Sequence, residues 1–179
     1  MYRNGIKRLL AVILSLGGMI CLSPLLLVLC IAIKLDSPGP VFFKQKRVGI
    51  HKQHFNILKF RTMRIDTPHD MPTHLLHDPD QYITRVGRFL RKTSLDELPQ
   101  FFNVLNGSMS LVGPRPPLPK EVEKYTPYQM HRLDAKGGIT CYWQCSGRSN
   151  IMFDEWVELD LKYIRDRSIS TDAKILAKT

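Results

Sequence analysis

An uninterrupted apolar run near the N-terminus constrains this chain more than any other feature. Residues 9–33 contain no charged side chain, and most of them are apolar. These 25 residues would form a helix long enough to cross the ~30 Å hydrocarbon core of a bilayer at ~1.5 Å per residue. No small-residue cleavage site with a polar mature start follows the run, so it favours a membrane helix over a cleaved signal peptide.

The flanks of this run argue against a simple span. Three basic residues lie within residues 3–8, and Lys34 and the basic segment 44–64 follow the run. Basic flanks are typical of the cytoplasmic side, and only a helix that dips in and returns places both flanks there. Ser23 and Pro24 lie near the middle, where proline kinks a helix and a serine hydroxyl can satisfy the freed carbonyl. Prolines also occur in ordinary spans, so the residues alone leave re-entry and spanning open.

The positive charge of the chain is concentrated in one segment. The net charge is +10, and residues 44–64 contain seven of the basic residues and no acid: Lys44, Lys46, Arg47, Lys52, Lys59, Arg61 and Arg64. Such a face attracts phosphates, which nucleic acid, anionic lipid headgroups or a phosphorylated small molecule could supply. A merely solvated basic face is the alternative.

The cysteines and histidines do not form a metal site or a disulfide framework by spacing. Cys21 and Cys30 lie in the apolar run, and Cys141 and Cys145 have no second pair to complete a zinc site. We expect all four thiols to be reduced, which is compatible with the cytoplasm. Three histidines in the Pro-rich loop 65–80 lack regular ligand spacing, so a solvated loop is the interpretation there.

The rest of the chain predicts a helix-rich α/β (α+β) domain of ordinary size. We expect a membrane segment over residues 1–36 and a cytoplasmic-face domain over 37–179. Short strands are predicted at 41–49 and 54–61, and these could pair as a hairpin. Helical periodicity follows at 83–92, from near Asp96 to Asn106-Gly107, at 120–135 and at 153–164, with a strand-like run between glycine turns at 137–148. Prolines between 114 and 119 should hold Arg115 on a stiff, extended segment.

Two adjacent carboxylates, Asp96 and Glu97, begin the second of these helices in the stretch Lys-Thr-Ser-Leu-Asp-Glu-Leu-Pro-Gln. A capping box between Ser94 and Glu97 explains one of them, and the helix dipole would favour the other. A catalytic or metal-binding pair is the alternative. This stretch alone does not decide between them.

Five motifs in order resemble one family. They are Ser23-Pro24, Lys59-Phe-Arg-Thr-Met63, Ser94-Leu-Asp-Glu-Leu-Pro-Gln100, Ser110-Leu-Val-Gly-Pro-Arg-Pro116 and Trp143-Gln-Cys-Ser-Gly-Arg148. Together they cover nearly the whole chain and closely resemble the bacterial sugar transferases called monotopic phosphoglycosyl transferases. The chain departs from the family at residues 135–138, where Arg-Pro-Gly is common, and at Cys141, where glycine is frequent.

The resemblance implies a membrane-bound transferase. A re-entrant helix-break-helix at Ser23-Pro24 would anchor the chain to the cytoplasmic leaflet of the bacterial inner membrane. Amphipathic helices at the interface would add to this anchor, and membrane lipids would be its partners. The reaction would move a sugar-1-phosphate from a UDP-sugar to polyprenyl phosphate, usually undecaprenyl phosphate, with Mg²⁺ and without nucleic acid. It would start assembly of a bacterial glycan. The resemblance allows a homodimer.

The same resemblance implies roles for individual residues. Asp96 is similar to the family's nucleophile, which holds a covalent phosphosugar, and Glu97 to its Mg²⁺ partner, with Asp96 as a second metal ligand. Substrate-binding residues would be Lys59, Arg61, Arg91, Arg115, Gln144 and Arg148. Attack by a carboxylate on a diphosphate needs cations nearby, so the chemistry agrees with these assignments. The rival interpretations are a single-span anchor with a basic nucleic-acid-binding module and a non-catalytic scaffold.

Overall fold

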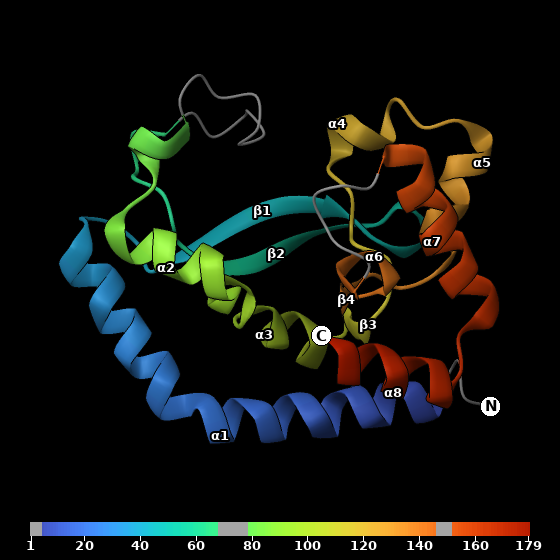
Figure 1. The fold of residues 1–179 in the computed structure, drawn as a ribbon, viewed down its shortest axis with the longest axis horizontal. Coiled ribbons are helices and arrows are strands. Elements are labelled where there is room, and N and C mark those ends of the chain that lie inside the picture. Colours follow the sequence, from blue (N-terminus) through green and yellow to red (C-terminus); the bar gives the residue numbers. More distant parts are fainter. Residues whose placement is uncertain (1–4, 68–78, 146–151) are drawn as a thin grey trace. The chain divides into compact units, whose positions relative to one another are not determined.

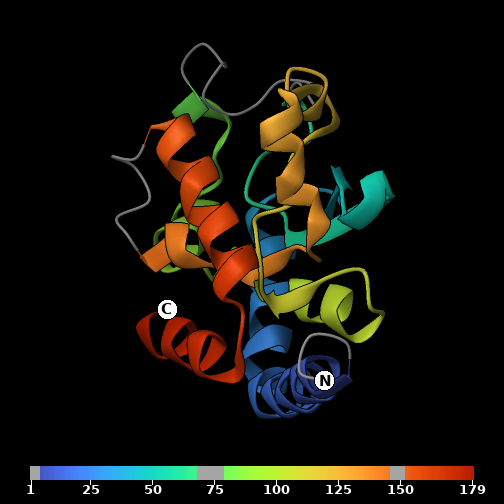
Figure 2. The ribbon, with the colours of Figure 1, turned by 90° about the vertical axis from the view of Figure 1, so that its right-hand side faces the viewer.

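The computed structural model describes residues 5–67, 79–145 and 152–179. Figures 1 and 2 show its helices and strands. The chain divides into two compact units. Unit 1 combines residues 1–18, 45–57 and 100–179, and unit 2 combines residues 19–44 and 58–99. The long first helix and the first two strands run through both units.

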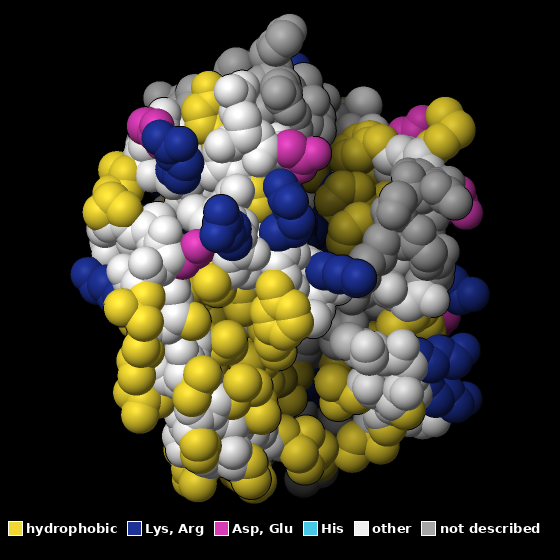
Figure 3. Space-filling view, turned by 60° about the vertical axis from the view of Figure 1, so that its left-hand side comes forward, with side chains coloured by type: hydrophobic (Ala, Val, Ile, Leu, Met, Phe, Trp, Pro, Cys, Tyr) yellow, Lys and Arg dark blue, Asp and Glu magenta, His cyan; other side chains and the backbone are white. Residues whose placement is uncertain are grey.

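Helix α1 (Lys7–Asp36) contains the predicted apolar run. It is long and apolar enough to cross a membrane, and only 11% of its most apolar window is buried. Figure 3 shows hydrophobic side chains gathered over part of the surface that it views, with lysine and arginine side chains beside them. Most of the apolar surface of α1 therefore faces outward, as expected for a helix whose solvent is lipid.

The middle of α1 carries the predicted Ser23-Pro24 pair without an interruption of the helix. Because Pro24 has no N–H, the carbonyl of Ile20 lacks its usual donor four residues later. The Ser23 hydroxyl donates to that carbonyl at 2.8 Å. This confirms the expected compensation. Helical conformation continues through Pro24, and the helix-break-helix arrangement and re-entry stay predictions.

Unit 1 is built around a short parallel sheet. Strands β3 (Ser110–Val112) and β4 (Gly138–Thr140) pair in parallel, with Ser110 opposite Gly138 and Val112 opposite Thr140. A Cβ on Gly138 would lie 2.1 Å from the backbone nitrogen of Gly113, so only glycine permits this approach. The core beside the sheet combines the start of α1, the strands and the C-terminal helices through Ala11, Ile57, Val104, Met109, Leu111, Val112, Cys141, Tyr163 and Ile175.

The helices of unit 1 differ partly from the predicted pattern. Helices α3 (Gln100–Leu105), α7 (Phe153–Asp166) and α8 (Ile169–Lys178) surround the core, and α7 confirms the predicted amphipathic helix. The single helix expected at 120–135 is instead three short ones, α4 (Pro119–Val122), α5 (Pro127–Met130) and η6 (His131–Asp134). Prolines begin both α4 and α5, because proline suits a first helical turn and not a helix interior.

The prediction of a strand-like run at 137–148 is also only partly confirmed. Strand β4 ends at Thr140, and residues Tyr142–Cys145 form the short helix α6. The part of the run after Cys145 lies outside the described residues.

The predicted hairpin belongs partly to unit 1 and partly to unit 2. Strands β1 (Phe42–Val48) and β2 (His54–Phe60) are joined through the short helix η2 (Ile50–Lys52). The bonds Arg61 N–Val41 O at 2.8 Å and Gly49 N–Gln53 O at 2.7 Å close the two ends of the ladder, so the pairing is antiparallel. The predicted hairpin is confirmed.

Helix α2 (Arg85–Thr93) packs on a second core of unit 2 formed by Leu29, Ile33, Phe60 and Leu90. The Thr84 hydroxyl accepts from the Gly87 N–H at 2.9 Å and caps the helix. The helical spacing at 83–92 predicts Phe89 on the apolar face together with Val86 and Leu90, but Phe89 is 55% exposed. The reason is Gly87, where a Cβ would lie 2.1 Å from Thr62 O, so the buried face is centred on Gly87 and Leu90.

Candidate functional site

The predicted carboxylate pair lies on a tight turn of unit 2. Asp96 and Glu97 belong to the 3-10 turn η5 (Leu95–Glu97), directly after α2, and α3 begins only at Gln100. Ser94 adopts a left-handed conformation with φ 58° and ends α2, and its side chain makes no capping bond. The predicted capping box is therefore wrong. A non-glycine residue in this conformation is costly, and such residues are common at functional sites.

A lysine from the hairpin meets both carboxylates. The Lys59 ammonium lies 2.6 Å from Glu97 Oε1 and 3.9 Å from Asp96 Oδ2. The side chains of Lys59, Asp96 and Glu97 are only 15%, 14% and 23% exposed. Alternation along β2 directs Lys59 to this turn, and a partly buried cluster of one cation and two anions results.

Burial and neighbouring charges set the proton affinity of Asp96. Burial raises the pKa of Asp96 above its usual value, and the Glu97 charge adds to this effect, while Lys59 and Arg91 oppose it. Burial likewise lowers the pKa of the Arg91 guanidinium, and the Asp96 charge opposes that shift. A carboxylate that is partly stripped of water and held among fixed charges is a typical reactive group.

The two other predicted cations of unit 2 have different surroundings. Arg91 donates from Nε to Thr62 Oγ1 at 2.9 Å, which holds the guanidinium near the turn. Arg61 is buried and donates to Pro40 O at 2.6 Å, Ser37 Oγ at 2.7 Å and Ser37 O at 2.8 Å. These bonds give Arg61 a structural role in holding residues 37–40, and its contact with substrate stays a prediction.

The remaining predicted substrate-binding residues belong to unit 1. Arg115 lies with its Cζ 5.8 Å from the ring centroid of Trp143. The Gln144 amide donates to Ile139 O at 3.2 Å, and Arg148 lies outside the described residues. Their grouping with Asp96 stays a prediction.

The donor atoms at the turn suit a hard cation. Among residues 5–67, 79–145 and 152–179, no group of three or more His, Cys, Asp or Glu side chains could hold a metal ion alone. Mg²⁺ is usually bound through one or two carboxylates, with water and substrate phosphates completing its octahedron. Asp96 and Glu97 therefore fit Mg²⁺ as a partial ligand set, with Lys59 now occupying one Glu97 oxygen.

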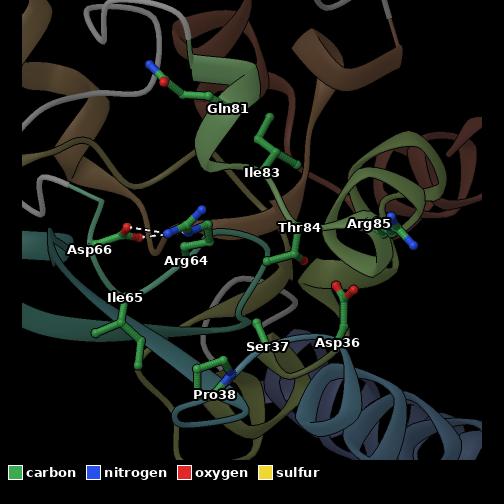
Figure 4. Close-up of a pocket in the computed structure, with 10 residues that line it drawn as sticks. All are labelled: Asp36, Ser37, Pro38, Arg64, Ile65, Asp66, Gln81, Ile83, Thr84 and Arg85. Carbon is green, nitrogen blue, oxygen red and sulfur yellow. Dashed lines mark hydrogen bonds and ion pairs between the residues drawn. The ribbon is translucent and has the colours of Figure 1, made fainter.

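A pocket that the sequence did not predict lies at the other end of α2 (Figure 4). Its volume is about 580 Å³, and three separate segments line it: Asp36, Ser37, Pro38, Arg64, Ile65, Asp66, Gln81, Ile83, Thr84 and Arg85. Asp36 accepts from the Val86 N–H at 2.9 Å, and Arg64 pairs with Asp66 at 2.7 Å. No local sequence pattern announces a pocket whose walls come from three distant segments.

Comparison with known proteins decides the family of the chain. The sequence pattern of the family described as "bacterial sugar transferase" matches residues 2–179. The chain belongs to this family. It is 40% identical to the undecaprenyl-phosphate galactose phosphotransferase of Salmonella typhimurium, over 97% of the chain. It is 39% identical to the UDP-glucose:undecaprenyl-phosphate glucose-1-phosphate transferase of Escherichia coli, over 98% of the chain.

The chain spans less than half the length of several curated relatives that it matches. The chain spans 39% of the Salmonella protein and 40% of the Escherichia coli protein. It covers 85% of a Bacillus subtilis protein named uncharacterized sugar transferase EpsL, to which it is 41% identical over 97% of the chain. The chain thus matches a part of the two enterobacterial relatives and most of the Bacillus subtilis relative.

Proposed function

We propose that this protein transfers a sugar-1-phosphate from a UDP-sugar to undecaprenyl phosphate, releases UMP and so initiates bacterial glycan assembly. The observation that carries the proposal is the partly buried pair Asp96 and Glu97 beside Lys59, on the motif that resembles the family's catalytic stretch. The printed activities of the Salmonella and Escherichia coli relatives support the same donor and acceptor classes.

Asp96 would act as the nucleophile. A carboxylate oxygen attacks the sugar-bearing phosphorus, the bond from that phosphorus to the UMP oxygen breaks, and UMP leaves with that electron pair. The phosphosugar is then held on Asp96 as an acyl phosphate. The phosphate oxygen of the lipid attacks the same phosphorus, and the carboxylate of Asp96 is regenerated.

The surrounding charges would make this attack feasible. Two anions, a carboxylate and a diphosphate, repel each other, so cations must lie where charge accumulates. Lys59 and Arg91 provide fixed positive charge on the carboxylate side. When bound at Glu97 and Asp96, Mg²⁺ would neutralise the diphosphate.

We propose further that α1 enters and leaves the membrane on the cytoplasmic side. At its start, Lys7 pairs with Asp172 at 2.9 Å and donates to Val112 O at 2.9 Å, inside the folded part of unit 1. At its end, the Asp36 carboxylate caps α2 in unit 2 through the Val86 N–H. Both ends of the apolar helix are thus held by folded, polar protein.

The connections between the units make a span costly. The chain passes between unit 1 and unit 2 along β1, along β2 and between residues 99 and 100. If α1 spanned the bilayer, these connections would have to cross it too, and β1 carries Lys44, Lys46 and Arg47. Charged residues and an open two-stranded sheet are excluded from the hydrocarbon core.

The activity is tested with purified protein, Mg²⁺, undecaprenyl phosphate and a panel of UDP-sugars, with UMP release as the readout. We expect release with at least one donor, together with labelled sugar bound to the protein when the lipid is omitted. Absence of release with every donor would contradict the enzyme assignment. Release without any protein-bound label would contradict the covalent step alone.

The topology is tested separately by cysteine labelling in intact cells and in inverted vesicles. Cysteines placed at Gly5 and at Ser37, in a background without the four native thiols, should react from the same side of the membrane. Labelling from opposite sides would establish a span.

A further inference from the structure

A continuous stack of aromatic rings and cations extends through unit 1. The rings of Trp143 in α6 and Trp156 in α7 are stacked, with centroids 4.8 Å apart and planes inclined by 23°. The Arg132 Cζ lies 4.6 Å from the Trp156 centroid, and the Arg115 Cζ lies 5.8 Å from the Trp143 centroid. The order Arg115, Trp143, Trp156, Arg132 therefore joins a half-buried arginine to the interior.

The inner end of this stack is rigid. Arg132 donates from Nε and Nη2 to Asp160 Oδ2 at 2.9 and 2.7 Å, and the two side chains are 1% and 0% exposed. Breaking a buried pair of this kind leaves an uncompensated charge, so its geometry is strongly held. Arg132 also donates from Nη1 to the Tyr125 hydroxyl, so all three guanidinium nitrogens make hydrogen bonds.

The position of Trp156 depends on these stacking contacts. Its indole N–H is buried and has no hydrogen-bond partner within the described part of the chain. Phe153 meets its ring edge-on, with centroids 6.1 Å apart. Stacked rings and cations over ring faces are favourable contacts with preferred geometry, so they can set the plane of Trp156 and, through it, that of Trp143.

We propose that Trp156, backed by the Arg132–Asp160 pair, is a positioning residue for Arg115, and that Arg115 is thereby pre-oriented to bind the diphosphate of the nucleotide donor. This inference rests on the proposed function, because UDP-sugar is the ligand. An arginine has five donors in a planar fork that suits phosphate oxygens. The Trp143 ring restricts the conformations of the Arg115 side chain before the ligand binds, so less conformational entropy is lost on binding.

The experiment is calorimetric binding of UDP to the full chain in detergent. Trp156→Leu removes the stack, and we expect the dissociation constant for UDP to rise by about three- to thirtyfold, the range of a cation–ring contact. Trp156→Phe keeps a ring and should stay within about twofold. Tyr128→Phe is the matched control, because it removes an exposed bond from α5 to Glu158 of α7 and leaves the stack intact.

A double-mutant cycle separates positioning from general damage. In an Arg115→Ala background, Trp156→Leu should have almost no further effect on UDP binding, because the residue that it positions is gone. Additive effects would overturn the proposal. If Trp156→Leu does not fold, Trp143→Leu in the same cycle gives the same decision, since Trp143 is only half-buried.

The two proposals fail in different ways. If the unsubstituted protein binds no UDP, the role of Arg115 in nucleotide binding is overturned. If UDP binds and the cycle is non-additive but no donor gives UMP, the inference about Arg115 stands and the proposed transferase activity fails.

Discussion

Lys59 Nζ lies 2.6 Å from Glu97 Oε1, and this ion pair brings the end of β2 to the turn that carries Asp96. The same ammonium is 3.9 Å from Asp96 Oδ2. The single charge of Lys59 therefore offsets the repulsion between the partly buried carboxylates of Asp96 and Glu97. The proton affinity of Asp96 depends on this arrangement, and this dependence can be measured.

Removing the Lys59 charge should shift the pH dependence of the reaction. The nucleophile must be ionised, so turnover falls at acid pH as Asp96 is protonated. Burial already raises the pKa of Asp96, and Lys59 lowers it. In Lys59→Met that lowering is lost, so the acid limb of kcat should move to higher pH, whereas Lys59→Arg should keep it near the original position. An unmoved limb in Lys59→Met would show that another group controls ionisation.

Replacing the nucleophile should separate activity from stability. Asp96→Asn is expected to lower UMP release by ~10³-fold or more, because an amide cannot take up the phosphosugar. Its thermal midpoint at neutral pH should be higher than that of the original protein. The raised pKa means that the folded state binds protons more tightly than the unfolded state, so stability falls as pH rises through the window between the usual and the raised value.

The measurement for Asp96→Asn is a melting curve at several pH values beside the UMP assay. The difference in melting midpoint between Asp96→Asn and the original protein should shrink as the pH falls below the usual aspartate range. Asp96 is then protonated in both the folded and the unfolded state of the original protein. A variant that melts lower than the original protein at neutral pH would contradict the assigned burial cost.

Gly87→Ala tests the close contact that orients α2. A Cβ at this position would meet Thr62 O at 2.1 Å, so α2 must shift away from the segment that also bonds Arg91. We expect a loss of ~1–3 kcal/mol in stability, as for overpacked sites. Gly17→Ala is the matched control, because nothing lies within 4 Å of its added Cβ, and it should melt no lower than the original protein.

The sequence predicted those parts of the fold whose signals are local. The strand patterns at 41–49 and 54–61 predicted the hairpin, and the apolar spacing at 153–164 predicted α7. Gly107, with φ 87°, follows the end of α3 as expected. These elements need only neighbouring residues to specify them. The predicted helix start near Asp96 is wrong, because Asp96 and Glu97 lie on a 3-10 turn and α3 begins at Gln100.

What the sequence missed depends on contacts between distant segments. The exposure of Phe89 follows from the contact of Gly87 with Thr62, which no helical periodicity contains. Lys7 was interpreted as a flanking charge of a membrane helix, but it is the partner of Asp172 across the core of unit 1. A basic residue beside an apolar run has the same sequence signature in both cases.

The Lys7–Asp172 pair should be essential to the fold of unit 1. Lys7 also donates to the Tyr163 hydroxyl, which in turn donates to Asp172 Oδ1 at 2.7 Å. Lys7→Met leaves the Asp172 charge buried without its cation, and we expect a loss of ~3–5 kcal/mol. The double variant Lys7→Met with Asp172→Asn should recover part of it in detergent melting. A double variant no more stable than Lys7→Met would show that packing, and not the unpaired charge, causes the loss.

The Ser23 hydroxyl should stabilise α1 at the point where Pro24 interrupts its hydrogen bonds. In lipid no water can satisfy the Ile20 carbonyl, so Ser23→Ala leaves it without the donor that now lies at 2.8 Å. We expect a loss of ~1 kcal/mol, measured by melting in lipid nanodiscs. Ser15→Ala is the control on the same helix, because the Ser15 hydroxyl is buried and makes no hydrogen bond within the described residues, and it should not lower the midpoint. If Ser23→Ala and Ser15→Ala lower the stability equally, the loss comes from side-chain packing and not from the unsatisfied Ile20 carbonyl.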